Sequence, residues 1–210
     1  MRRITIIAPE IADTPWPLGC DIAIVLQSAD EDREVRRRYT VRRVVGSELT
    51  LDAVLHGHGP GSTWAASVSE GDEVVFFGPR GDLDLPEPDA TGRVIALTDE
   101  SGLPAVAGVA ETLDWPMLVF AEVHDEAEQY PLPSGVEVRW LLRGDGPSGQ
   151  PDLMLKALDG LASGDDLAYA YVLGESRAIV RVRDELARFG LGRKDVYAKG
   201  YWNLNARPTR

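Results

Sequence analysis

Residues 36–43 read Arg-Arg-Arg-Tyr-Thr-Val-Arg-Arg, and residues 56–65 read His-Gly-His-Gly-Pro-Gly-Ser-Thr-Trp-Ala. The arginines supply a fixed fork of hydrogen-bond donors that matches phosphate oxygens. Tyr39 adds a flat face on which a ring system can stack, and the glycines let backbone N–H groups approach an anion closely. Each segment alone is a weak signal, and the two together predict a cradle for a dinucleotide.

The glycine loop has neither of the two common nucleotide-binding spacings, so it predicts a phosphate site of another kind. Gly57, Gly59 and Gly61 permit the positive backbone angles of an anion nest. Ser62 and Thr63 are expected to cap the helix that follows, which would leave its N-terminus facing an anion.

The first part of the chain predicts an antiparallel β-barrel. Its apolar residues come in short runs rich in β-branched side chains, and only residues 63–68 have a helical pattern. We expect consecutive strands to pair, because this is the simplest antiparallel solution. The expected strands are residues 4–7, 22–26, 39–45, 49–55 and 74–77.

The second part predicts an α/β domain with a parallel sheet. Residues 78–89 are dense in Gly, Pro and Asp and separate two domains, which we expect at residues 1–84 and 92–210. Strands then alternate with helices, and ligands of such sheets bind beyond the carboxyl ends of the strands. The expected strands are residues 94–97, 117–123, 136–142, 168–173 and 195–201, and the expected helices are residues 103–113, 152–161 and 176–189.

Composition limits the class of protein. The 210 residues carry a formal net charge of -12, which argues against general binding to nucleic acids or anionic membranes. No apolar run approaches the roughly 20 residues that span a bilayer. The single cysteine, Cys20, fits a reducing compartment, and we expect a cytoplasmic protein.

Hydrolytic and metal chemistry are poorly supported. The chain has no G-x-S-x-G sequence and only three histidines. His56 and His58 are two residues apart, but His124 lies in the other half of the chain, so we expect no metal site.

Several motifs in one order resemble the siderophore-interacting protein family, over about residues 37–202. The N-terminal part looks like that family's FAD-binding barrel, and the segment from Thr98 to Ala105 resembles its Asp-Glu-Thr-x-Leu-Pro-Ala sequence. The matching stations are Arg37-x-Tyr39-Thr40-x-Arg42, His56-Gly57, Gly59-Pro60-x-Ser62-x-Trp64-Ala65, Gly71-Asp72, Gly78-Pro79, Asp99-Glu100, Leu103-Pro104-Ala105, Val138-x-Trp140-Leu141, Gly174-Glu175 with Arg177 and Arg183, and Gly200-Tyr201-Trp202.

The resemblance implies a ferredoxin-reductase-like fold, in which a flavin-binding β-barrel precedes an NAD(P)-binding α/β domain. By analogy, Tyr39 would stack on the isoalloxazine of FAD, Thr40 would bond near its hydride-accepting nitrogen, and Arg37 would neutralise a phosphate. Further FAD contacts are implied for Arg42, His56, Gly57, Gly61, Ser62, Thr63 and Trp64. Contacts with NADPH or NADH are implied for Asp99, Glu100, Pro104, Ala105, Gly174 and Glu175.

The implied activity is an NAD(P)H-dependent flavin reductase that reduces ferric siderophores and releases ferrous iron. It needs no catalytic side chain, because the flavin carries the redox chemistry. Lys199, Arg80 and Arg207 are candidates for binding the negatively charged chelate.

Alternative interpretations stay open. The chain could be a non-catalytic flavin-binding or partner-binding module of the same fold. The arginine run alone could be a solvated edge strand protected by its charge, and Glu175 alone could simply favour the start of a helix.

Overall fold

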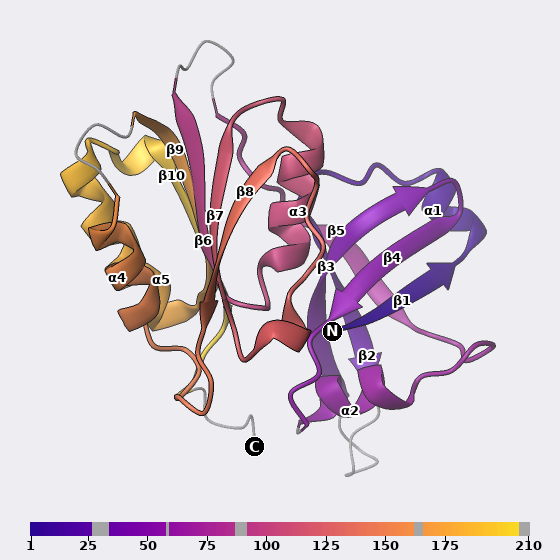
Figure 1. Ribbon diagram of the computed structural model, residues 1–210. Helices are drawn as coiled ribbons and strands as arrows, with labels where there is room; N and C mark the ends of the chain where they lie inside the picture. The colour runs from indigo at the N-terminus through magenta and orange to yellow at the C-terminus, as the bar shows by residue number, and fades with distance from the viewer. Residues whose placement is uncertain (27–33, 58, 87–91, 162–165, 206–210) are drawn as a thin grey trace. The chain divides into compact units, whose positions relative to one another are not determined.

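The computed structural model describes residues 1–26, 34–57, 59–86, 92–161 and 166–205 (Figure 1). The chain divides into two compact units. The first contains Met1–Leu83 and Ala107–Val109, and the second contains Asp84–Val106 and Ala110–Arg210.

The first unit is built on a five-stranded antiparallel sheet with the strand order β1-β4-β3-β2-β5. Its core is formed by apolar side chains that alternate along the strands, with Ile22, Ile24 and Leu26 from β2 facing Leu49 and Leu51 from β4. The strands are β1 Arg2–Ile7, β2 Asp21–Leu26, β3 Val35–Val45, β4 Glu48–Ala53 and β5 Phe76–Arg80, and the helices are α1 Pro9–Ala12 and α2 Pro60–Ser67.

Consecutive pairing, the expectation from the sequence, is wrong for part of this sheet. Strand β1 pairs with β4, and β2 pairs with both β3 and β5. The tight turn at Gly46, which has a φ of 56°, joins β3 directly to β4, whereas the longer connections after β1 and β4 let the chain reach strands that are not its neighbours in sequence.

The arginine run lies in β3, the central strand of the sheet, but the two halves of this strand have different partners. Residues 35–40 pair with β2, and the pairs with β4 run from Val41 to Val45. Arg36, Arg37 and Arg38 are exposed, while Thr40 on the same strand is buried. Within the described sheet the arginine segment thus pairs with a strand on one side, as the edge-strand interpretation expects.

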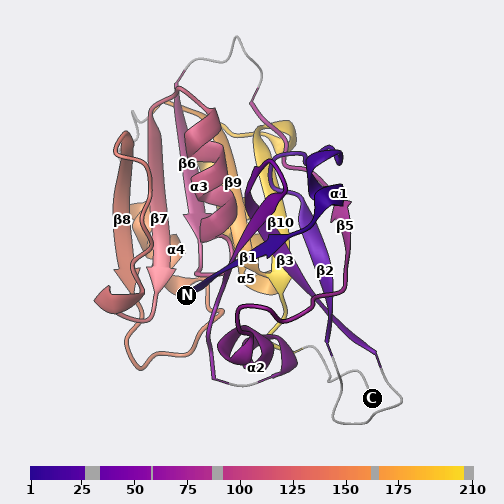
Figure 2. The ribbon, with the colours of Figure 1, turned by 90° about the vertical axis from the view of Figure 1, so that its right-hand side faces the viewer.

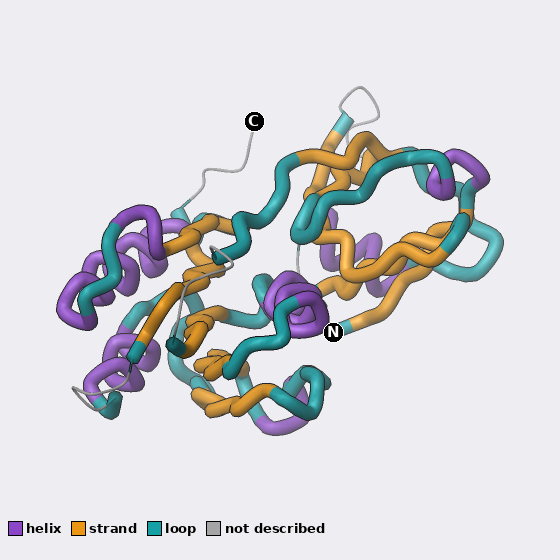
Figure 3. Tube along the Cα trace, turned by 90° about the horizontal axis from the view of Figure 1, so that it is seen from above, coloured by secondary structure: helices purple, strands orange, loops and turns teal. Residues whose placement is uncertain are grey.

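The second unit is a parallel five-stranded sheet with the order β10-β9-β6-β7-β8. Helices α4 and α5 pack together on one face, and α3 lies on the other (Figures 1, 2 and 3). The strands are β6 Arg93–Thr98, β7 Met117–Val123, β8 Val136–Leu142, β9 Leu167–Glu175 and β10 Val196–Trp202, and the helices are α3 Leu103–Thr112, α4 Asp152–Asp159 and α5 Ser176–Glu185, with 3-10 turns at Glu126–Glu128, Leu186–Phe189 and Arg193–Asp195.

Burial on both faces explains why these strands are almost continuously apolar. All seven residues of β7 are buried, and Leu118 and Phe120 pack in one cluster with Ile95 and Leu97 of β6 and with Val182 of α5. The chain adds β7 and β8 on one side of β6 and then crosses to add β9 and β10 on the other. The carboxyl ends of β6 and β9 thus form the topological switch point, where sheets of this class bind ligands.

Candidate functional site

The predicted dinucleotide cradle of the first unit brings β3 against α2. The Tyr39 hydroxyl donates to the Gly61 carbonyl oxygen at 3.0 Å, and the Tyr39 ring centroid lies 5.4 Å from that of Trp64. A Cβ atom on Gly61 would lie 2.9 Å from the Tyr39 hydroxyl oxygen and 3.2 Å from Cγ of Arg37. Glycine at this position therefore lets the first turn of α2 pack closely against the side chains of β3. Burial raises the pKa of Tyr39 to about 12, opposed by the charge of Arg37, so the phenol stays neutral.

The glycine loop differs from the expectation at the start of α2. The helix begins at Pro60, and Gly59 occupies the capping position with a φ of 80°. Ser62 lies in the first turn of α2, and its Oγ accepts hydrogen bonds from the backbone nitrogens of His56 and Gly57 at 3.0 and 3.2 Å.

The predicted caps, Ser62 and Thr63, are consequently wrong as caps. Proline suits the first helical position, and glycine takes the left-handed backbone before it without strain, so the helix starts earlier than its polar residues suggested. Ser62 instead orders the loop by binding two of its backbone N–H groups. Thr63 is exposed, and its backbone nitrogen donates to the Gly59 oxygen at 3.0 Å.

Thr40 is the residue of this cradle that most directly indicates a ligand. It is 7% exposed, and within the described parts of the chain its Oγ1 has no hydrogen-bond partner. Buried hydroxyl groups are rarely left unpaired, because the loss of water is not compensated. Arg42 follows at an irregularity in the pairing of β3 with β4, between Val41 and Arg43. The neighbouring Gly57 has a φ of 77° and open space around its missing Cβ.

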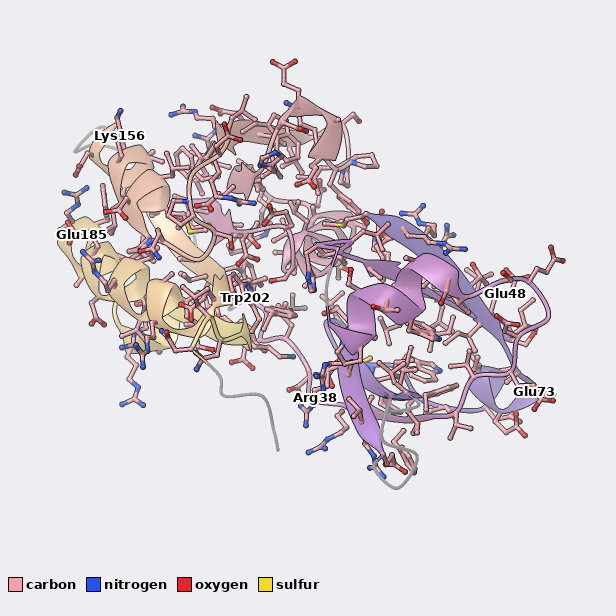
Figure 4. The ribbon with its side chains drawn as sticks, turned by 90° about the horizontal axis from the view of Figure 1, so that it is seen from below. Arg38, Glu48, Glu73, Lys156, Glu185 and Trp202 are labelled. Carbon is pink, nitrogen blue, oxygen red and sulfur yellow. The ribbon has the colours of Figure 1, made fainter. Side chains whose placement is uncertain are left out.

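In the second unit, Asp99 is the centre of the switch point. Its Oδ1 accepts from the backbone nitrogen of Ser101 at 2.9 Å and from Ser101 Oγ. Its Oδ2 accepts from the backbone nitrogen of Glu175 at 3.1 Å and from Nε1 of Trp202 at 2.8 Å. Burial raises the pKa of Asp99, while the hydrogen bonds from Ser101 and Trp202 oppose this shift. Figure 4 labels Trp202 at the end of β10.

Two glycines allow close packing at the ends of β6 and β9. A Cβ atom on Gly174 would lie 2.5 Å from Oδ2 of Asp99, and Gly174 has a φ of 145°. A Cβ atom on Gly102 would lie 2.3 Å from Oγ1 of Thr98 and 2.6 Å from Cβ of Leu173. Gly174 therefore makes room for the carboxylate, whereas Gly102 lets the turn before α3 pack against both strands.

Glu175 makes its contacts within the chain. Its Oε2 accepts from the backbone nitrogens of Arg177 and Ala178 at 2.7 and 2.8 Å, which caps α5. Its Oε1 accepts from the backbone nitrogen of Leu204 at 3.1 Å. The interpretation of Glu175 as a favourable helix start is confirmed, and a role in binding a dinucleotide stays a prediction.

A second polar cluster lies at the carboxyl ends of β6, β7 and β8. Arg143 donates from one terminal nitrogen to Glu100 at 2.7 Å and from the other to Glu122 at 3.0 Å. Burial raises the pKa of Glu122 to about 7 against the opposing effect of Arg143. Two carboxylates already hold this arginine, so it is not a free anion receptor.

Four other predicted residues lie within the described part of the chain. Pro104 and Ala105 are in the first turn of α3, and the Lys199 ammonium lies 5.5 Å from the ring centroid of Tyr201. Arg80 is exposed at the end of β5. Arg207 and His58 fall outside the described residues.

Sequence reasoning missed four residues that build the second unit's site: Ser101, Glu122, Arg143 and Trp202. Glu122 had a signal, because it interrupts the apolar run of residues 117–123. Trp202 belonged to a motif that resembles the family, but no role was assigned to it. Among the described residues, no cluster of His, Cys, Asp and Glu could hold a metal ion, and no helix is long and apolar enough to cross a membrane.

Comparison with known proteins agrees with this arrangement. The model of the siderophore-interacting FAD-binding domain matches residues 2–83, and the siderophore-interacting protein model matches residues 91–205. Among solved structures, a siderophore utilization protein from T. fusca is 31% identical with a TM-score of 0.84, covering 98% of this chain and 87% of that one. SipS from Aeromonas hydrophila is 26% identical with a TM-score of 0.78, covering 98% and 86%.

Curated relatives carry reductase names. The ferric vibriobactin reductase ViuB of Vibrio cholerae is 33% identical over 82% of this chain and 66% of its own length. The NADPH-dependent ferric-chelate reductase of Escherichia coli is 28% identical over 74% of this chain and 61% of its own length. The matched region is thus slightly less than two thirds of these relatives. The two family models together span both units, and the chain belongs to the siderophore-interacting protein family, with a ferredoxin-reductase-like fold.

Proposed function

We propose that this protein is an FAD-dependent NAD(P)H:ferric-siderophore reductase. The observation that carries the proposal is the cradle on β3, which presents an exposed arginine, Arg37, a neutral tyrosine, Tyr39, and the buried Thr40 hydroxyl, which has no partner among the described residues. We assign FAD binding to residues 1–84 and NAD(P)H binding to residues 92–210.

The residues of the first unit fit FAD. The Tyr39 ring can stack on a flat ring system, and the Thr40 hydroxyl can bond to a polar ring atom. Arg37 can pair with a phosphate, with Arg42 as a second cation. The loop through Gly57 and Gly61 can approach the rest of the dinucleotide, because neither residue has a side chain in the way. When bound, FAD would supply hydride acceptance and single-electron transfer.

The second unit supports a nicotinamide dinucleotide. The switch point at the ends of β6 and β9 is the ligand position of parallel α/β sheets, and Asp99, Gly174 and Glu175 meet there. Glu100 and Arg143 form a neutralised pair beside it. NADPH and NADH both remain candidates.

In the proposed reaction, the two electrons of one NAD(P)H reduce two ferric chelates. One NAD(P)H releases a hydride, which carries two electrons, and each of two ferric chelates accepts one electron, leaving NAD(P)⁺ and one proton. Hard oxygen donors hold ferrous iron less tightly than ferric iron, so reduction loosens the metal. Because the protein carries a net charge of -12, an anionic chelate needs local cations, and Arg80, Lys199 and Arg207 are the proposed ones.

The experiment measures ferrous iron directly. Purified protein with added FAD, NADPH or NADH and a ferric catecholate or hydroxamate chelate is incubated without oxygen, and a ferrous-specific dye reports the product. We expect dye formation that requires protein, FAD and nicotinamide together. FAD binding without any ferrous product would instead support the alternative, a non-catalytic flavin-binding or partner-binding module.

A further inference from the structure

The segment that follows β10 is held down on the switch point by three side chains. Trp202 donates its indole N–H to Asp99, and its carbonyl oxygen accepts from Ser176 Oγ at 2.7 Å. Two residues further on, the backbone nitrogen of Leu204 donates to Glu175 at 3.1 Å. We name this set, Asp99, Glu175 and Ser176 with residues 202–204, the terminal lock.

The lock joins three strands that are distant in sequence. Asp99 follows β6, Glu175 ends β9, and Trp202 ends β10. The Asp99 carboxylate accepts four hydrogen bonds, two from Ser101 and one each from Glu175 and Trp202. One buried group thus fixes the turn between β6 and α3, the turn between β9 and α5, and an indole ring together.

The surrounding chain leaves little freedom for a different arrangement. A Cβ atom on Gly149 would lie 2.7 Å from the Trp202 ring and 2.9 Å from Cγ of Glu175. A Cβ atom on Gly200 would lie 2.5 Å from Ser176 Oγ. The backbone therefore packs directly against the locked side chains, and this close packing holds them in one arrangement.

Asp99 also stabilises the fold, because an apolar side chain in its place would leave the N–H donors of Ser101, Glu175 and Trp202 without their acceptor. What an apolar residue cannot do is fix the Trp202 ring and the Glu175 backbone through directional bonds. The polar lock therefore specifies one geometry at the position where this class of sheet binds its ligand.

We infer that Asp99 is a positioning residue for the nicotinamide dinucleotide, because it locks Trp202 and the Gly174–Glu175 turn into one preformed arrangement at the switch point. This inference rests on the proposed function and extends it. The lock lowers the ordering cost of binding, since these groups are fixed before the dinucleotide arrives.

The test uses the full chain with FAD and two variants that break the same hydrogen bond from opposite sides. Asp99→Asn keeps the shape, loses the charge and replaces one of the two acceptor oxygens with an NH2 donor, so it cannot accept from both Ser101 and Trp202. Trp202→Phe keeps an aromatic ring and loses the N–H donor. Asp125→Asn is the matched control, because Asp125 is an exposed carboxylate in the same unit that accepts from the backbone nitrogen of Ala127.

Titration calorimetry with NADP⁺ and NAD⁺, which involves no turnover, gives the dissociation constant. We expect it to rise about tenfold or more in both lock variants and to change less than twofold in Asp125→Asn. The double variant should bind no more weakly than the worse single variant, because both changes remove one interaction. In steady-state assays, the KM for NAD(P)H should rise much more than kcat falls.

A second readout follows the lock without any ligand. The Trp202 indole N–H should exchange with solvent at least tenfold faster in Asp99→Asn than in the wild-type protein, measured by NMR. If Asp99→Asn folds poorly, the binding measurement is made on Trp202→Phe instead. If the wild-type protein binds the dinucleotide and both lock variants bind it with the same dissociation constant, this inference alone is overturned. If the wild-type protein binds no dinucleotide, the proposed function is overturned as well.

Discussion

Gly102→Ala provides a sharp test of the packing at the switch point. The added Cβ would lie 2.3 Å from Oγ1 of Thr98 and 2.6 Å from Cβ of Leu173, where ordinary contacts are at 3.4–4 Å. Thr98 and Leu173 are fully buried partners on adjacent strands, so neither can turn away. Gly102 precedes α3, so the alanine gains little from helix propensity. Overpacking of this kind costs about 1–3 kcal/mol.

Urea unfolding followed by circular dichroism measures this cost. A loss in this range should lower the melting temperature of a chain of this size by about 2–12 °C. Gly135→Ala is the control, because its Cβ would meet nothing within 4 Å and its φ is not in the left-handed range. The control should change stability by less than about 0.5 kcal/mol. Equal stability of Gly102→Ala and the wild-type protein would refute the reasoning.

Three further predictions address the two sites. Tyr39→Ala should weaken FAD binding about tenfold or more while the far-ultraviolet spectrum stays unchanged, because it removes the stacking surface; unchanged flavin content after gel filtration would contradict the assignment. Arg37→Ala should weaken FAD binding more at low salt than at high salt, since ions screen a phosphate contact. Equal losses of affinity at about 50 and about 500 mM salt would argue against a phosphate contact of Arg37. The pKa of Glu122 is raised from 4.5 to about 7, so between these two pH values the folded protein holds a proton that the unfolded chain releases. The stability of the wild-type protein relative to Glu122→Gln should therefore fall as the pH rises from 4.5 to about 7, and stay level at higher pH. Thermal melts at several pH values measure this difference, and a difference that rises with pH would reverse the conclusion.

The sequence was a good guide to elements and a weaker guide to their pairing. The antiparallel first part and the parallel second part are confirmed, because alternating and continuous apolar runs report directly on burial. The pairing of β1 with β4 was not visible, since strand neighbours depend on long connections and not on local pattern. The start of α2 was misplaced by three residues, because Gly59 and Pro60 set it in place of a polar cap.

The candidate site divides in the same way. Tyr39, Gly61 and Trp64 come together as their motifs suggested, and Thr40 is buried with an unpaired oxygen in the described part of the chain. The hydrogen bond between Asp99 and Trp202 joins residues 103 positions apart, and no local pattern predicts such a contact. Motifs therefore identified candidate residues, while the structure was needed to find their partners.

Electron transfer through the bound flavin can be followed by an anaerobic titration of the FAD-loaded protein, with its visible absorption spectrum as the readout. We expect NADPH or NADH to bleach the flavin bands and a ferric chelate then to restore them, with two ferric ions consumed per nicotinamide oxidised. A protein that binds no FAD, or whose bound flavin stays oxidised with both nicotinamides in excess, would contradict the proposed function.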